Sequence, residues 1–228
     1  MIATNERFAG KTLVVRVDDA SVHAAGSTFV EDLAVLTEAH VRPIVVAPDS
    51  TAARDIVRTI NRRANVAVAL SGSDAALLPH SPGGIGHVQP GILRILTEAG
   101  YIPVIEPTAF AVFAADDAQV DADAVAGAVA AAVEAVRAIF FHAAGGVLDP
   151  ATQAMIAELT PAEALLLADD LALPEDLRSV IRAAAIGVRG GVPAAQIVDG
   201  RIAHATVVEL LTAQHVGTQV TGGIHLAA

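Results

Sequence analysis

Short apolar runs alternate with amphipathic segments along the chain, and this alternation constrains the fold more than any other feature. Each run is apolar at consecutive positions, which is typical of strands that are covered on both faces of a parallel sheet. We therefore predict an α/β fold, a three-layer α/β/α sandwich with a mainly parallel central sheet of about eight strands. The expected strands are 12–17, 42–47, 66–70, 102–105, 138–141, 195–198 and, at an edge, 218–220.

The intervening segments have the apolar spacing of helices that bury one side. One of them opens on a capping signal, in which Thr160 caps the helix, Pro161 takes its first position and Glu163 closes the box. No linker or low-complexity block interrupts the alternation, so we expect residues 1–228 to form a single domain. The expected helices are 27–39, 52–63, 90–99, 123–137, 160–168, 174–186 and 204–213, and residues 81–86 are expected to form a loop.

Composition narrows the classes of partner. Asp and Glu number 25 against 14 Lys and Arg, a net charge of −11, and such a surface repels nucleic acid and anionic membranes. The absence of cysteine excludes disulfides, thiolate nucleophiles and cysteine-type zinc sites. The first residues lack a signal-peptide profile, and no apolar run approaches the ~20 residues that span a bilayer. We expect a cytoplasmic protein without nucleic-acid or membrane partners.

Several segments carry a family resemblance. FAGKTLVVRV, INRRANVAVALSGSDAALL, GYIPVIEP and GGVPAAQIVDGRIAHATVVELLTAQHVGT occur in the order in which similar segments occur in amino-acid kinases. Among these the chain most resembles the N-acetylglutamate kinases. The resemblance implies the amino-acid kinase (carbamate kinase-like) fold and the family's reaction, transfer of a phosphoryl group from ATP with Mg²⁺ to a carboxylate.

The phosphate-binding motifs of that family are altered at the first strand. The family ends this strand in Lys-x-Gly-Gly, whereas this chain has Arg16 at the lysine position and Asp18 and Asp19 at the glycines. The two aspartates add negative charge and Cβ atoms, and both oppose close approach of a phosphate to the backbone. Alternation along the strand predicts that Arg16 and Asp18 share a face and that Asp19 takes the other.

Two further motifs that bind substrate and phosphate also depart from the family. Its second strand ends in His-Gly-Gly-Gly-Pro, but here Pro48 removes an amide donor, Asp49 adds charge, and Ser50 follows. The chain after this point is markedly shorter than the family. The Leu-Ser-Gly-Lys-Asp motif loses its lysine and keeps Ser71, Gly72 and Asp74.

The remaining motifs lie in the second half of the chain. Where the family has Asn-x-Asn-Ala-Asp, this chain has Asp121, Ala122 and Asp123, so only the last Asp is kept among the motif's polar residues. His142 replaces the family's nucleotide-contacting Thr-Asp-Val segment, and Val180 stands at the second catalytic lysine. Asp123 is interpreted as the vestigial organiser of the site; the competing interpretation is a carboxylate that only stabilises a helix N-terminus.

These residues make up the predicted site. Arg16 and Asp123 are its catalytic positions, and the remnant of the nucleotide and substrate pocket comprises Asp18, Asp19, Asp49, Ser50, Ser71, Gly72, Asp74, Asp121, His142 and Val180. We expect Arg16 to pair with Asp18 or Asp123, because guanidinium and carboxylate satisfy each other. A collapsed or water-filled pocket without nucleotide would result.

Each lost oxyanion donor typically costs ~3 kcal/mol of barrier reduction, so several losses together predict that phosphoryl transfer is abolished. We therefore predict a pseudokinase with a binding, regulatory or scaffold role linked to arginine-type amino-acid biosynthesis. The alternative is an active ATP-dependent kinase acting on N-acetyl-L-glutamate or a related amino acid. A third hypothesis uses the aspartates for metal-dependent chemistry, although solvated loop aspartates are commoner.

Cofactors and partners follow from these hypotheses. We expect no cofactor and no metal site, with ATP and Mg²⁺ required only under the active-kinase alternative. Small residues on the helices and the resemblance to a family that commonly pairs predict a homo-oligomer or a paired pathway protein.

Overall fold

The computed structural model describes residues 8–24, 26–82, 84–111, 117–211 and 217–222. Its centre is a sheet of eight strands in the order β10-β12-β11-β9-β1-β2-β6-β3. Neighbouring strands run parallel except β11 and β12. The bounds are β1 (Thr12–Arg16), β2 (Arg42–Val46), β3 (Ala67–Leu70), β6 (Ile102–Ile105), β9 (Arg137–Phe141), β10 (Glu158–Leu159), β11 (Ala194–Val198) and β12 (Thr218–Thr221).

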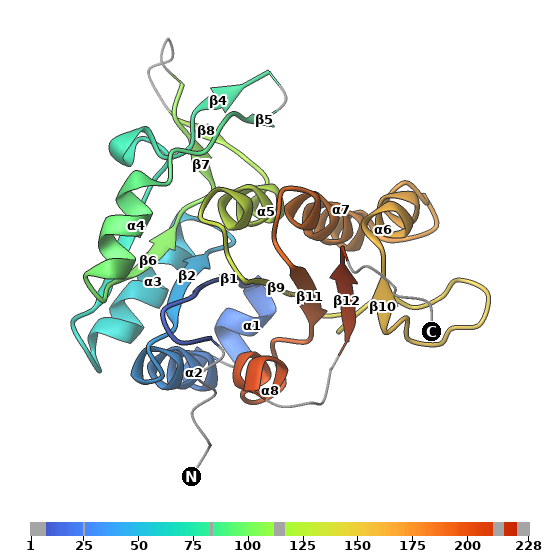
Figure 1. Cartoon of the computed structure of the whole chain (residues 1–228), viewed down its shortest axis with the longest axis horizontal. Coiled ribbons are helices and arrows are strands. Elements are labelled where there is room, and N and C mark those ends of the chain that lie inside the picture. Colours follow the sequence, from blue (N-terminus) through green and yellow to red (C-terminus); the bar gives the residue numbers. More distant parts are fainter. Residues whose placement is uncertain (1–7, 25, 83, 112–116, 212–216, 223–228) are drawn as a thin grey trace.

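Helices cover both faces of this sheet and give three layers (Figure 1). One layer comprises α1 (Asp19–Ala24), α2 (Gly26–Glu38), α3 (Ser50–Asn61) and α8 (Ala205–Leu211), and the other α4 (Gly91–Glu98), α5 (Ala122–Ala132), α6 (Pro161–Ala168) and α7 (Glu175–Arg189). A separate apolar core lies on each face, because strand residues alternate between them: Val14 joins the α5–α7 core, and Leu13 and Val15 join the other. The predicted mainly parallel three-layer fold is confirmed.

Two small antiparallel pairs lie together at one end of the molecule (Figure 1). They are β4 (His80–Ser81) with β5 (Gly84–Ile85), and β7 (Thr108–Ala109) with β8 (Ala118–Gln119). The expectation of a plain loop at 81–86 is therefore wrong, because part of that segment pairs as a hairpin.

Three other expectations need correction. Helix α1 was not expected, because its six residues are too few to show a clear apolar period. Helix α5 ends at Ala132 rather than at residue 137, since Glu134 takes a positive φ of 55° and Arg137 already begins β9. Strand β12 is not at the edge of the sheet, because β10 pairs with it. The last residues of the helix expected at 204–213 lie outside the described residues.

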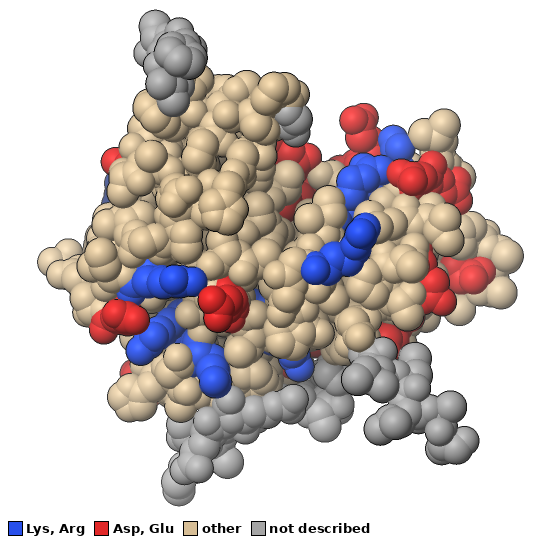
Figure 2. All heavy atoms as spheres, turned by 45° about the horizontal axis from the view of Figure 1, so that its top comes forward, with Lys and Arg blue, Asp and Glu red and all other residues tan. Residues whose placement is uncertain are grey.

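Within the described part of the chain, none of the helices has the length and apolarity needed to cross a membrane. On the face drawn in Figure 2, basic and acidic side chains are interspersed, and no broad basic patch forms there.

Candidate functional site

Two adjoining hollows open where β1, β2 and β9 end and where α5 and α7 begin. The larger has a volume of about 440 Å³ and the smaller about 240 Å³. Both are lined by Arg16, Pro48, Asp123 and Asp176, so they form one continuous depression, which we call the cleft. The carboxyl edge of a parallel sheet is where open α/β folds bind ligands, and the pocket expected there is open rather than collapsed.

An ion pair crosses the cleft. Arg16, the last residue of β1, contacts the carboxylate of Asp123 in the first turn of α5 through its Nε. Both side chains are largely buried, at 15% and 7% exposure. The contact is electrostatic rather than a well-aligned hydrogen bond, because neither Arg16 Nε nor Asp123 Oδ1 meets a hydrogen-bond partner in suitable geometry. Of the two partners predicted for Arg16, the structure selects Asp123.

Burial also changes the acidity of Asp123. Desolvation raises the pKa of its carboxyl above the usual 3.8, and the positive charge of Arg16 opposes this rise only in part. The nearby Asp121 carboxylate raises this pKa further. The carboxylate of Asp123 thus faces the guanidinium of Arg16, the residue that the resemblance places at the family's first lysine.

Asp121 stabilises the start of α5. As the N-cap residue, it accepts hydrogen bonds from the amides of Asp123 and Ala124 through Oδ1, at 2.7 and 3.0 Å. Its other oxygen accepts a bond from the Ser179 hydroxyl at 2.7 Å, which ties the start of α5 to α7. The carboxylate thus holds the rim of the cleft together.

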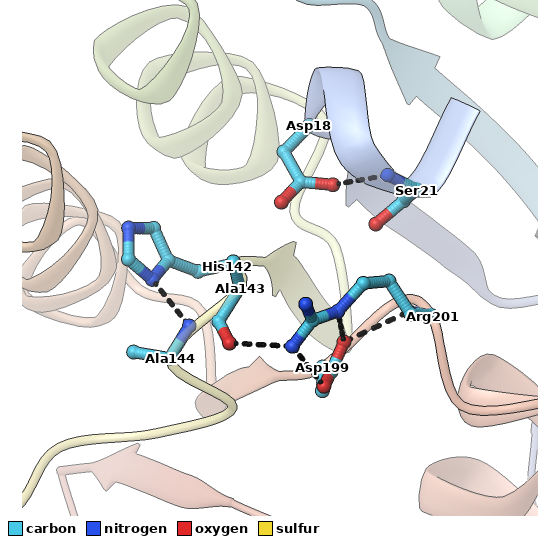
Figure 3. Close-up of polar contacts among 7 residues, drawn as sticks. All are labelled: Asp18, Ser21, His142, Ala143, Ala144, Asp199 and Arg201. Atoms are coloured by element: carbon cyan, nitrogen blue, oxygen red, sulfur yellow. Dashed lines mark hydrogen bonds and ion pairs between the residues drawn. The ribbon is translucent and has the colours of Figure 1, made fainter. Parts of the chain in front are cut away.

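His142 closes the smaller hollow from the end of β9. Its Nδ1 accepts a hydrogen bond from the amide of Ala144 at 3.1 Å (Figure 3). Nε2 lies 3.3 Å from a carboxylate oxygen of Asp176 at the start of α7. His142 is therefore engaged on both ring nitrogens and lies in the cleft, as predicted from sequence.

Asp18 and Asp19 line the smaller hollow together with Arg16. The expectation that Asp19 points to the opposite face is wrong, because β1 ends at Arg16 and Asp19 already begins α1. Asp18 accepts a hydrogen bond from the amide of Ser21 at 2.8 Å, so it starts this helix (Figure 3).

Arg201 lies near Asp18, but its hydrogen bonds go to other groups. It donates to both oxygens of Asp199, at 2.9 and 2.8 Å, and to the carbonyl oxygen of Ala143 at 2.9 Å (Figure 3). These bonds from Arg201 lower the pKa of Asp199 and join the ends of β9 and β11. This pair of contacts was not predicted from the sequence, although Asp199 and Arg201 are only two positions apart.

The other predicted site residues lie outside the cleft lining. Asp49 caps α3 by accepting from the amides of Thr51 and Ala52, and Ser50 is the first residue of that helix. Beyond β3, Ser71 bonds to Asp74, and the amide of Gly72 donates to the hydroxyl of Thr108. These residues therefore organise their own turns, and the structure does not bring them to Arg16.

Helix α7 brings two arginines to the larger hollow, and neither was predicted from the sequence as a site residue. Arg178 and Arg182 line it, while Val180, which the resemblance places at the family's second lysine, is 1% exposed and borders the smaller hollow. Arg182 donates to Asp169 and to the carbonyl of Ala168. The Nε of Arg178 is buried without a partner. The helical spacing of 178 and 182 was the available signal, since residues four apart share a face.

The aspartates do not converge on a metal-binding geometry. In the part of the chain that the structure describes, no group of three or more His, Asp and Glu side chains is placed to hold a metal ion. The carboxylates at the cleft serve instead as helix caps and as ion-pair partners.

Sequence comparison identifies a family and several curated relatives of this chain. The profile of the amino acid kinase family matches residues 11–199. An acetylglutamate kinase of Synechococcus sp. (strain WH7803) is 31% identical over 267 residues, covering 95% of this chain and 91% of that protein. One from Gluconacetobacter diazotrophicus is 32% identical over 216 residues, covering 86% and 68%. The first alignment is longer than this whole chain of 228 residues, so the relative carries segments that the chain lacks.

Solved structures show the same fold. N-acetylglutamate synthase from Neisseria gonorrhoeae, complexed with coenzyme A and N-acetyl-glutamate, matches with a TM-score of 0.77 at 19% identity, covering 96% of this chain and 61% of that one. The chain thus spans about three fifths of that synthase. An isopentenyl phosphate kinase matches with a TM-score of 0.64 at 12% identity, covering 91% and 99%. Together with the family match, these findings show that the chain belongs to the amino acid kinase family, close to the acetylglutamate kinases.

Proposed function

We propose that this acetylglutamate kinase-like protein is a pseudokinase, which binds a small molecule or a partner in its cleft and no longer transfers a phosphoryl group. The observation that carries the proposal is the ion pair between Arg16 and Asp123. A phosphate would have to displace a buried carboxylate to reach the Arg16 guanidinium, and the carboxylate would then be left without its cation.

The cleft residues fit Mg²⁺–ATP poorly. Asp18, Asp19 and Asp123 line the smaller hollow, where they would face a triphosphate with like charge. Val180 supplies no charge where the family has its second lysine. The aspartates could attract a cation, but they are not grouped as metal ligands within the described residues. We therefore assign no step of phosphoryl transfer to these side chains.

Calorimetric titration with Mg²⁺–ATP tests the proposal. We expect no measurable binding to the natural protein. The variant Asp18→Gly/Asp19→Gly/Arg16→Lys/Val180→Lys should gain ATP affinity if charge and steric blockage closed the site. A control that also removes two negative charges, Asp55→Asn/Glu98→Gln, acts away from the cleft and should gain none. Tight ATP binding by the natural protein would refute the proposal.

One observation favours the alternative of an active kinase. The cleft is open, and Arg178 and Arg182 place two guanidinium groups along its wall. Under this alternative these arginines substitute for the absent lysines, and the substrates are ATP with Mg²⁺ and N-acetyl-L-glutamate or a related amino acid. Activity that is lost in Arg178→Gln and retained in Arg189→Gln, on the same helix, would support it.

The role in the cell is also part of the proposal. The resemblance to acetylglutamate kinases favours a task in arginine-type amino-acid biosynthesis, carried out in the cytoplasm. We further propose that the chain acts as a homo-oligomer or beside a paired pathway protein and that residues 1–228 form one domain.

A further inference from the structure

A third hollow runs beside the cleft, in a groove between α5 and α7. Its volume is about 380 Å³. The β4–β5 hairpin contributes one wall through Ile85 and Gly86. The remaining lining residues are Asp121, Ala124, Gly127, Ala128, Ser179, Arg182, Ala183 and Ile186.

The groove is apolar because small residues form its floor. Gly127 lets the two helices approach closely, since a Cβ at this position would lie 2.6 Å from the carbonyl oxygen of Ala183. Ala124 and Ala128 leave the space above them unfilled. Ile186 stands beside this space with 51% of its surface exposed. Covering these groups would remove apolar surface from water, which favours an apolar ligand.

The groove and the cleft meet. Asp121, Ser179 and Arg182 line both the groove and the larger hollow of the cleft. An elongated molecule can therefore lie with one end among the polar groups of the cleft and the other along the apolar floor.

The charged groups at the junction of groove and cleft indicate whether the polar end of such a ligand should be an anion or a cation. Arg16 pairs with Asp123, Arg182 with Asp169, and Asp176 with His142. Asp121 is occupied by Ser179 and by two amides at the start of α5.

Two other charged residues line the larger hollow, Glu175 and Arg178. Glu175 is exposed, so water screens its charge. Arg178 is half-buried, and its Nε is buried without a hydrogen-bond partner. Among the described residues no carboxylate forms an ion pair with Arg178, so its guanidinium is the cation of the larger hollow that is left to attract an anion.

We infer that this protein binds an amphipathic carboxylate, with the carboxylate on Arg178 and an aliphatic chain in the groove between α5 and α7. Arg182, which is paired with Asp169, stands at the boundary of the two parts. The inference extends the proposed binding role of the cleft, but it concerns a region beside the phosphate-facing residues.

A series of linear carboxylates tests the inference by calorimetry. Affinity should rise from butanoate through hexanoate to octanoate, by roughly threefold for each added methylene group that enters the groove. Octylamine has a chain of similar length with a cationic head and should bind much more weakly than octanoate. Equal affinity along the carboxylate series, or preferential binding of octylamine, would overturn the inference.

Variants separate the two ends of the ligand. Arg178→Gln should weaken octanoate about tenfold or more, as expected for a lost hydrogen bond to a charged group, while Arg189→Gln should change little. Ala128→Phe fills the groove and should remove the dependence on chain length, whereas Ala162→Phe, on exposed α6, should not. Ile186→Asp provides a second test, because a half-exposed position on the groove tolerates a charged side chain without unfolding the protein. Unchanged octanoate binding in both Arg178→Gln and Ile186→Asp would refute the inference.

The outcome is distinguishable from that of the proposed function. Failure of octanoate to bind leaves the pseudokinase proposal intact, provided that Mg²⁺–ATP also fails to bind. Binding of both ATP and octanoate would refute the pseudokinase proposal and retain the groove.

Discussion

Arg16 at the end of β1 and Asp123 in the first turn of α5 neutralise each other across the cleft. The two residues are more than 100 positions apart in the chain, and the parallel sheet brings them together because β1 lies next to β9, the strand that follows α5. We propose that the pair occupies the place where the family's chemistry needs a free cation. Several testable properties of the protein depend on it.

The first prediction concerns the stability of the pair. Asp123→Leu leaves the Arg16 guanidinium largely buried without its counter-charge, and we expect it to lower the free energy of unfolding by about 3 kcal/mol. The double variant Arg16→Met/Asp123→Leu removes both charges and should recover most of this loss. Urea unfolding of the natural protein and both variants measures the difference. A double variant less stable than Asp123→Leu would contradict the account.

A second prediction concerns pH. Because burial raises the pKa of Asp123 in the folded protein above the usual 3.8, the unfolded chain loses this proton more readily than the folded one. The contribution of Asp123 to stability is therefore most favourable below pH 3.8, and it falls as pH rises through the window between 3.8 and the raised value.

Asp123→Asn removes this titration and is the matched comparison. The difference in free energy of unfolding between the natural protein and Asp123→Asn, measured by urea at a series of pH values, should shift against the natural protein as pH rises through that window. A difference that moves in the opposite direction would show that Arg16 outweighs burial.

The third prediction concerns the packing of α5 against α7. Gly127→Ala places a Cβ 2.6 Å from the carbonyl oxygen of Ala183, so the helices must move apart. We expect a loss of about 1–3 kcal/mol in unfolding free energy, as in other overpacked cores. Gly91→Ala in α4 is the control, since a Cβ there meets nothing within 4 Å. Equal stability of the two variants would argue against this close approach.

A fourth prediction concerns assembly. Exposed apolar side chains such as Leu166 on α6, with 74% of its surface exposed, favour contact with a second copy. Light scattering at micromolar concentration should give the mass of a dimer or a larger assembly. A strict monomer there would count against this prediction.

Local signals in the sequence predicted much of the fold. The capping box at α6 is confirmed, with Thr160 N donating to Glu163 at 2.8 Å and Glu163 N donating to Thr160 Oγ1 at 3.3 Å. Continuous apolar runs located the parallel strands, since only a strand covered on both faces needs them. The short strand β10 was missed, because two residues carry no periodic signal.

Site residues could be predicted from the sequence where their position depends only on the end of one strand or the start of one helix. Arg16, Asp18, Asp19, Asp121, Asp123, His142 and Val180 all line the cleft. Asp49 and Asp74 were indistinguishable from them in sequence, but each satisfies amides of its own turn. Arg178 was missed, because its place at the cleft depends on how α7 packs against α5, and Gly127 allows these two helices to approach closely.

The most direct test of the account is an assay of phosphoryl transfer from Mg²⁺–ATP to N-acetyl-L-glutamate by the purified protein. Because the ion pair with Asp123 occupies Arg16, we predict no turnover above background, with an active acetylglutamate kinase as the positive control. Steady turnover that disappears in Asp123→Ala would contradict the account, since it would make Asp123 a working part of a functional kinase site.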